Sequence, residues 1–176
     1  ICIIGDGKLN GLIGAHLTFP KAKIFTVNLS ETLINDYIIL KELNIELKNS
    51  IELVDNLEFR VSDKIVHLIP SNLKDFLLNK NIDLFINIAS FQEMNVNEIN
   101  RYFVIVKKNK SKIYCCNREY KKLVGNEELY FNKYPWGNYK KIFWENCPWY
   151  KKFYAFKPPF IREYNGNIIH CLVDYC

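Results

Sequence analysis

The sequence opens with Ile1-Cys-Ile-Ile-Gly-Asp-Gly-Lys-Leu-Asn-Gly-Leu-Ile-Gly14, and this stretch decides the fold. Four apolar residues in a row predict a buried parallel strand, and glycines follow at positions 5, 7 and 11 before a helix-like run over 12–17. Strand, glycine-rich turn and helix in this order are typical of a nucleotide-cofactor loop, because glycines let the backbone approach a ligand and the helix N-terminus offers free N–H groups. A turn whose glycines serve only tight packing is the alternative.

The apolar runs that follow extend this opening into an alternating chain. We predict strands over residues 1–4, 23–27, 65–69, 82–88 and 113–116, and helices over 10–19, 31–43, 72–79 and 96–108. Asn10 and Ser30 stand where N-caps are expected. Residues 45–47 and 51–54 each fit a short strand or a loop. Alternation of this kind predicts a mostly parallel sheet with helices on its faces.

The regular pattern changes after Asn117. Residues 118–150 contain scattered aromatic residues without clear periodicity, which indicates a long irregular insertion with one helix near 119–124. Residues 153–163 and 168–175 then alternate and flank Asn165-Gly166-Asn167. An Asn-Gly turn between two such runs predicts an antiparallel hairpin at the C-terminal end.

Composition places the chain among ordinary globular domains, with one asymmetry. Apolar residues make up 49% and charged residues 24% of the 176 residues, enough for one domain with a sizeable core. No apolar run approaches the ~20 residues of a membrane helix, and no signal-peptide pattern opens the chain, so we expect a cytoplasmic protein without a membrane span. The net charge is +5, yet residues 101–176 alone hold 15 Lys and Arg against 6 Asp and Glu, together with 19 aromatic residues. We interpret this half as a solvated basic face over an aromatic core.

Cysteine and histidine spacing argues against disulfides and metal ligands. The six cysteines form no Cys-x-x-Cys pair, which indicates buried reduced thiols. The three histidines are far apart and show no metal-site spacing. His67 lies inside an apolar strand, and we interpret it as a core residue rather than a catalytic one.

The candidate site lies in the segments that follow the predicted strands, because ligands bind outside the carboxyl ends of the strands in open α/β sheets. After the second strand, an acid commonly holds ribose hydroxyls; here Asn28 stands in that place, followed by Leu29. Asp6 is either a second polar contact for a cofactor or a turn aspartate that bonds local N–H groups. Pro70 and Ser71 follow the third strand, where an adenine ring usually lies.

The segment Asn87-Ile-Ala-Ser-Phe-Gln-Glu-Met94 places several polar side chains at the mouth of the central strand. Group transfer to a hydroxyl needs a donor held in line and a base that takes the proton. Glu93 is the best base candidate by placement. A role in capping the next helix or anchoring the loop is the alternative for Glu93.

Several motifs together resemble the sugar O-methyltransferase family over about residues 1 to 117. They are Gly5-Asp-Gly-Lys-Leu-Asn-Gly11, the turn Asn28-Leu-Ser-Glu31 leading to Tyr37, the block Asp83-Leu-Phe-Ile-Asn-Ile-Ala-Ser-Phe-Gln-Glu-Met94, and Tyr102-Phe103. The family pattern pairs a glycine-rich first loop with a strand that ends in Asn-x-x-Ser-x-x-Glu-Met, which the chain matches by position. The chain departs from the family at Asn28, where an acid is common, and at Asn10, where a glycine is usual.

The resemblance implies a three-layer, Rossmann-like α/β fold of the class I methyltransferases, with a mostly parallel seven-stranded sheet and a C-terminal antiparallel hairpin. It implies S-adenosyl-L-methionine as the cofactor and a sugar hydroxyl of a glycan or nucleotide-linked sugar as the acceptor, with no nucleic-acid partner. Some sugar methyltransferases use a divalent ion, but Asp83, Glu93 and Glu98 form no clear set of metal ligands, so we assign no metal residue. The implied cofactor contacts are Gly5, Asp6, Gly7, Gly11, Asn28, Leu29, Pro70, Ser71 and Asn87. The implied substrate contacts are Ser90 and Glu93, with Glu93 as the catalytic base. Beyond the resemblance, we predict that Tyr134 and Trp136 contact the substrate as a sugar-stacking wall; aromatic packing within the insertion is the alternative for each. Because the chain begins directly in a strand, we expect residues 1–176 to be a single domain from the C-terminal part of a longer protein.

Three other functions are alternatives for this sequence, and each has its own requirement. An NAD(P)-dependent oxidoreductase or epimerase on the same fold would need a Gly-x-Gly-x-x-Gly spacing, which fails at Asn10. A nucleic-acid-binding module would need the charges of the basic half on one face. A degenerate methyltransferase without cofactor binding is the third.

Overall fold

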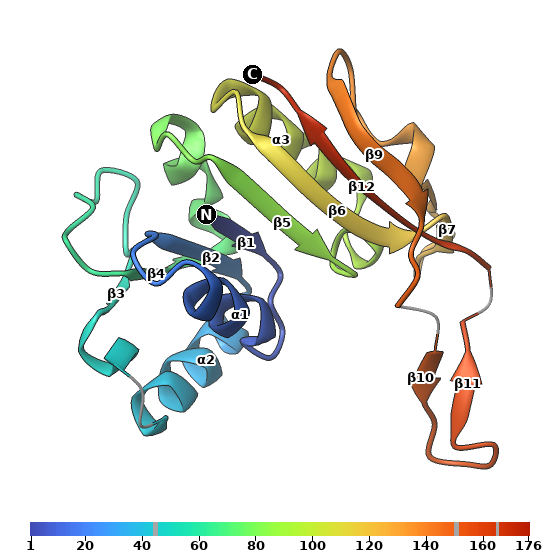
Figure 1. Cartoon of the computed structure of the whole chain (residues 1–176), viewed down its shortest axis with the longest axis horizontal. Coiled ribbons are helices and arrows are strands. Elements are labelled where there is room, and N and C mark those ends of the chain that lie inside the picture. Colours follow the sequence, from blue (N-terminus) through green and yellow to red (C-terminus); the bar gives the residue numbers. More distant parts are fainter. Residues whose placement is uncertain (44–45, 150–151, 165) are drawn as a thin grey trace.

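The computed structural model describes residues 1–43, 46–149, 152–164 and 166–176. Its centre is an eight-stranded sheet with the order β3-β4-β2-β1-β5-β6-β12-β9 (Figure 1). The parallel strands are β1 (Cys2–Ile4), β2 (Ile24–Asn28), β3 (Ile51–Leu53), β4 (Val66–Pro70), β5 (Leu84–Ile88) and β6 (Lys112–Arg118). Strand β12 (Ile168–Asp174) lies antiparallel between β6 and β9 (Lys140–Asn146).

The insertion of the last strand beside β6 decides the fold class. From β4 to β9 the sheet places the third, second, first, fourth, fifth, seventh and sixth strands side by side, with β3 added outside them. This order, with an antiparallel seventh strand, is that of the class I methyltransferases, and the predicted Rossmann-like α/β fold is confirmed. The sheet has eight strands rather than seven because residues 51–53 pair with β4 as an extra parallel edge strand. The other segment that fits a short strand or a loop is 45–47, and its first residue, Ile45, lies outside the described residues.

The antiparallel C-terminal pair is formed by other strands than predicted. Strand β12 pairs with β6 and β9, whereas residues 152–163 form a separate hairpin of β10 (Lys152–Tyr154) and β11 (Ile161–Glu163). Asn165, the first residue of the predicted turn, lies outside the described residues. The physical reason for this pairing is burial, because β12 carries apolar residues on both faces and β10 and β11 are exposed along their whole length.

The segment predicted to be irregular is more regular in the structure. Strands β7 (Tyr120–Lys122) and β8 (Glu128–Tyr130) form a small hairpin where a helix was predicted, and η4 (Phe131–Lys133) follows. Strand β9 then enters the main sheet at its edge. All residues of β9 are exposed or half-buried, so its sequence lacks the alternation that identifies a strand.

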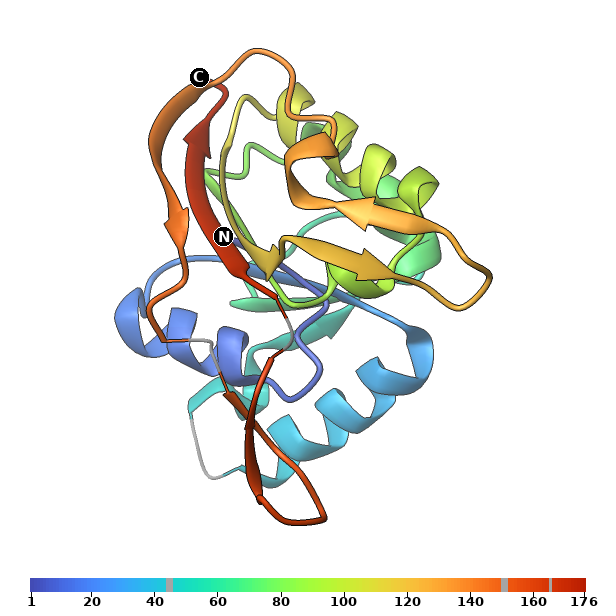
Figure 2. The same ribbon diagram turned by 90° about the vertical axis from the view of Figure 1, so that its right-hand side faces the viewer.

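Helices cover the two faces of the sheet (Figures 1 and 2). On one face, α1 (Asn10–Thr18) and α2 (Ser30–Glu42) cover a core that includes Leu12, Leu33 and Leu40. On the other face lie η2 (Ser71–Asn79) and α3 (Val96–Lys108), whose core is larger and rich in aromatic rings. The short helices η1 (Glu46–Asn49) and η3 (Phe91–Glu93) lie in connections. No described helix is long and apolar enough to cross a membrane.

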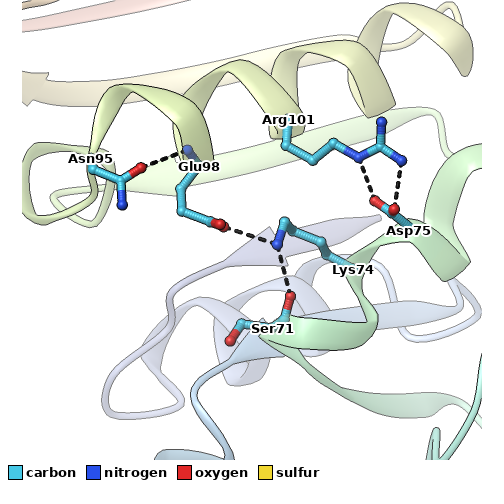
Figure 3. A network of polar contacts seen from close by, with 6 residues as sticks. All are labelled: Ser71, Lys74, Asp75, Asn95, Glu98 and Arg101. Carbon is cyan, nitrogen blue, oxygen red and sulfur yellow. Dashed lines mark hydrogen bonds and ion pairs between the residues drawn. The ribbon is translucent and has the colours of Figure 1, made fainter.

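Polar contacts fix η2 against α3 (Figure 3). Arg101 of α3 forms a two-bond ion pair with Asp75 of η2, and its Nε donates to Oδ1 at 2.6 Å. Lys74 Nζ lies 2.9 Å from Glu98 Oε2. Asn95 caps α3 by accepting the Glu98 N–H at 2.9 Å. These contacts join η2 to α3 behind the carboxyl ends of β4 and β5.

The predicted N-caps of the first two helices are wrong. Leu9 and Leu29 occupy the N-cap positions of α1 and α2, and neither helix receives a side-chain cap from Asn10 or Ser30. Leu9 adopts a left-handed conformation with φ 59°, which turns the chain sharply into α1.

All six cysteines are free, as predicted, and five of them are buried while Cys176 is exposed. Burial raises the pKa of Cys2, Cys116 and Cys171 to about 12, because the thiolate loses its hydration inside the sheet. These thiols are therefore unreactive core residues.

Candidate cofactor site at the carboxyl edge of the sheet

A cavity of about 440 Å³ opens where β1 and β5 end. It is lined by the glycine loop, by the start of α1 and by the end of β5 with Ala89. The predicted contacts Gly5, Asp6, Gly7 and Gly11 all line this cavity. Its volume falls within the ~300–1,000 Å³ that small-molecule sites span.

The glycines of the loop have different physical roles. Gly5 has φ +73°, and a Cβ there would overlap the side chain of Ser90. A Cβ at Gly11 would lie 3.2 Å from both Asp6 Oδ2 and Ile3 Cγ2. Gly7 has no neighbouring heavy atom within 4 Å of such a Cβ, so its backbone faces open space. Gly5 and Gly11 therefore serve close packing, while Gly7 leaves room for a ligand.

Asp6 caps the first helix. Its carboxylate accepts the N–H groups of Gly11 at 3.2 Å and Leu12 at 2.7 Å. This is the local backbone role that the sequence offered as an alternative to cofactor binding. The Asp6 carboxylate thus occupies N–H groups at the start of α1 that an anionic ligand would otherwise use. Asp6 also lines the cavity.

Asn28 ties the glycine loop to α2. Its Nδ2 donates to the carbonyl oxygen of Asp6 at 3.0 Å and lies 3.4 Å from Asp36 Oδ2, and its Oδ1 accepts the Leu29 N–H at 3.2 Å. The side chain of Leu29 is exposed beside it. Asn28 therefore shapes the loop, and the amide suits this task because it donates to one neighbour and accepts from another.

Asp36 is a residue that the sequence reasoning missed. Its side chain is buried under the glycine loop. The pKa of Asp36 is raised to about 6, mainly because the side chain is buried; the hydrogen bond from Asn28 opposes this rise, and the nearby Asp6 charge adds to it. A signal existed in the sequence, since this acid lies on the same helix face as Leu33 and Leu40.

Pro70 and Ser71 lie at the same edge but not in the same cavity. Pro70 is the Cα partner of Asn28 in the β2–β4 pairing. It lines a second, apolar cavity of about 650 Å³ between α2 and strands β3 and β4. The Ser71 carbonyl oxygen accepts a hydrogen bond from Lys74 Nζ at 3.2 Å (Figure 3).

Asn87 and Ser90 act as supports at the ends of the strands: full burial removes Asn87 from direct ligand contact, whereas Ser90 is half-buried and its contact with a substrate stays a prediction. Asn87 is 0% exposed, and its Nδ2 donates to the Ile4 carbonyl at 3.2 Å and to Ser90 Oγ. Asn117 Nδ2 donates to Asn87 Oδ1 at 2.8 Å, and Ser90 Oγ donates to the Ile4 carbonyl at 2.8 Å. These side chains bind the ends of β1, β5 and β6 to one another, because buried polar groups must find partners.

Glu93 lies at the end of η3, and its side chain is 58% exposed. Its Oε1 lies 3.1 Å from Lys121 Nζ of β7. The alternative that Glu93 caps the next helix is wrong, because Asn95 caps α3. Glu93 is not one of the described residues that line the glycine-loop cavity. The ion pair with Lys121 holds the Glu93 carboxylate at the carboxyl edge of the sheet.

Tyr134 and Trp136 are not available as a substrate wall, which corrects the prediction for both. They are almost fully buried on the α3 side of the sheet. Trp136 packs edge-on against Phe103 with ring centroids 4.9 Å apart, and its Nε1 donates to the Phe131 carbonyl at 2.8 Å. The rings belong to the core because they pack on other aromatic rings of this face, among them Phe103 and Phe131.

His67 lies inside β4 and does not line the glycine-loop cavity. His67 is buried beside Phe25 inside the sheet, and burial lowers its pKa, so it is the neutral core residue that the sequence indicated. Within the part of the chain that the structure describes, no group of three or more His, Cys, Asp and Glu side chains is placed to hold a metal ion.

Comparison with known proteins finds no matching family model and no matching curated protein. Among solved structures, the chain is similar to the methyltransferase domain of bacterial CtHen1-CN. The two share 12% identity with a TM-score of 0.49, and the match covers 98% of this chain and 88% of that chain. Similarity at this level carries no functional argument, so the fold assignment depends on the strand order.

Proposed function

We propose that the chain is an S-adenosylmethionine-dependent O-methyltransferase that acts on a sugar hydroxyl of a glycan or nucleotide-linked sugar. The observation that supports a cofactor-dependent transferase is the glycine-loop cavity at the carboxyl end of β1, in a sheet of class I order. The sugar acceptor is supported by the sequence resemblance of the block from Asn87 to Met94.

The residues at this edge fit such a cofactor. The open backbone at Gly7 and the apolar wall of Ile86 and Ile88 leave room for a small molecule, and exposed Leu29 offers an apolar surface beside the loop. Asn28 and Asp6 hold the loop in this shape. When bound, the cofactor supplies an electrophilic methyl group.

Glu93 is the residue that we assign to the acceptor hydroxyl. Its carboxylate is accessible and ionic contact with Lys121 orients it, so it can accept the hydroxyl proton as the new oxygen–carbon bond forms. Asn87 and Ser90 keep β5 and the following turn in place, and thereby set the position of η3.

Calorimetric titration with S-adenosylhomocysteine and, separately, with NAD tests the proposal. Micromolar binding of the first and no binding of the second supports it. Binding of NAD alone would favour an oxidoreductase. Absence of binding by both would contradict the proposal and favour a degenerate or purely binding domain.

The catalytic role of Glu93 has its own test. Glu93→Gln should keep the affinity for S-adenosylhomocysteine but lower turnover by about 10²–10⁴-fold. Glu98→Gln is the matched control, because Glu98 is another accessible acid paired with a lysine, and it should leave turnover unchanged. Turnover of Glu93→Gln near that of the control would show that Glu93 is structural.

A further inference from the structure

A β-hairpin arm projects from the carboxyl edge of the sheet. The arm comprises residues 152–163, with strands β10 and β11 and the turn between them. It is inserted between β9 and β12, and both views show it extending beyond the sheet (Figures 1 and 2). Because β9 is antiparallel to β12 and β12 is antiparallel to β6, the arm leaves the sheet at the edge where the candidate site lies.

The end of the arm is apolar and open to solvent. Phe156 is 105% exposed, Tyr154 87% and Phe160 60%, and Ile161 is also exposed. Single exposed apolar residues are ordinary, but four exposed apolar side chains within residues 154–161 of one hairpin favour an interaction site.

The arm is ordered by its own hydrogen bonds. The Ala155 N–H donates to the Phe160 carbonyl at 2.8 Å. The Arg162 guanidinium donates to three carbonyls of the turn, those of Lys157 and Pro159 at 3.3 Å and that of Pro158 at 3.1 Å. The apolar rings are therefore presented by a preformed turn, which lowers the entropy cost of binding.

Polarity changes along the arm. At its base Lys152 Nζ lies 4.0 Å from Glu163 Oε1. Two pairs nearer the tip, Tyr154 lies opposite Ile161, and the aromatic turn follows. The charged residues of the arm are Lys152, Lys157 and Arg162 against Glu163, so the arm is cationic overall.

Stacked side chains connect the arm to the candidate site. The Phe153 ring lies 5.0 Å from the Tyr164 ring, and the Arg118 guanidinium lies 4.8 Å from the same Tyr164 ring. The Arg118 N–H donates to Gln92 Oε1 at 2.9 Å, one residue before Glu93. This chain of contacts fixes the base of the arm relative to η3.

We propose that the arm docks the protein on an anionic lipid bilayer by inserting its aromatic tip into the membrane interface. A bilayer accepts a convex, apolar tip, and aromatic rings flanked by lysine suit the headgroup layer. Lys157, in the turn beside the apolar side chains, supplies a positive charge that suits anionic headgroups. Single-stranded nucleic acid needs a row of available cations, whereas Arg162 bonds the turn and Lys152 faces Glu163. The proposal is independent of the reaction at the glycine loop.

Flotation of the whole chain with vesicles of phosphatidylcholine, with and without phosphatidylglycerol, tests the proposal. We expect binding to the anionic vesicles, and at least about tenfold weaker binding of the double variant Phe156→Ser, Phe160→Ser, because two inserted rings are lost. Lys157→Glu should weaken binding only to the anionic vesicles and mainly at low salt. Phe19→Ser is the matched control, since Phe19 is an exposed ring at the far end of α1, and it should bind like the parent chain.

Two results would overturn the proposal. One is absence of vesicle binding by the parent chain, and the other is unchanged vesicle binding by the double variant. A single-stranded RNA oligonucleotide serves as the second probe. RNA binding that the double variant loses, without vesicle binding by the parent chain, would assign the arm to nucleic acid instead.

Discussion

The loop after β1 and the turn after β5 meet at one edge of the sheet but differ in what surrounds their polar groups. The first loop borders a cavity of about 440 Å³ and keeps open space at Gly7. The second is closed by the bonds among Asn87, Ser90 and Asn117. Both carry polar residues at a strand mouth, so residue type alone does not distinguish a ligand contact from an internal support.

The difference shows that a site of this fold needs a rigid side next to an open one. Gly5 crosses so close to Ser90 that the two loops fit together only without a side chain at Gly5. The closed network thereby holds the open loop in position. Substitutions on the two sides should consequently separate effects on stability from effects on ligand binding.

The largest effect is expected from Gly5→Ala. The new Cβ would overlap Ser90 and the residue would keep φ +73°, so we expect a loss of about 3–5 kcal/mol in the free energy of unfolding. Gly7→Ala is the matched control, with a loss below about 1 kcal/mol, because the space around Gly7 is open. Urea unfolding measures both; equal losses would contradict the distinction between packing and open glycines.

Asn87→Ala should lower the free energy of unfolding by about 2–3 kcal/mol, because it leaves the Phe91 N–H and the Asn117 amide without their buried acceptor. Asn28→Ala removes the hydrogen bonds of a half-buried side chain and should lower the free energy of unfolding by only about 1 kcal/mol. Calorimetry should show weaker binding of S-adenosylhomocysteine for Asn28→Ala. A larger loss of stability for Asn28→Ala than for Asn87→Ala would contradict the distinction between the open loop and the closed turn.

Asp36→Asn should stabilise the protein at neutral pH. The pKa of Asp36 is raised to about 6 by burial, so the folded state holds its proton more strongly than the unfolded state does. Stability therefore falls as pH rises from about 4 to 6, and above this window the ionised group costs on the order of 1–2 kcal/mol. Thermal unfolding at pH 4 and pH 7.5 should show a gain for Asp36→Asn only at the higher pH. A gain of the same size at both pH values would contradict the raised pKa.

The smallest effect on stability is expected from Lys121→Met, at most about 0.5 kcal/mol, because its ion pair with Glu93 lies near the surface. Turnover should nevertheless fall several-fold if Lys121 orients the base, while affinity for S-adenosylhomocysteine stays constant. Lys122→Met, the next residue of β7, is the control and should retain turnover. Equal turnover in the two variants would show that Lys121 does not orient Glu93.

Local patterns predicted the regular part of the chain. Helix α3 occupies residues 96–108 as predicted, since its apolar residues recur at helical spacing and face the core. The parallel strands lie within about two residues of their predicted bounds, because each is a short apolar run between turns. The helix caps were wrong at α1 because Asp6 lies outside the local window in which a cap is sought.

By itself, the sequence determined the alternating α/β class, the glycine loop and its place after the first strand. These follow from periodicity and from glycine's freedom, which are properties of neighbouring residues. Only the tertiary structure decided the pairing of β12, the burial of Tyr134 and Trp136, and the closure of Asn87 by Asn117. Each depends on residues far apart in the chain, and which side chains remain open to a ligand is fixed by what packs over them.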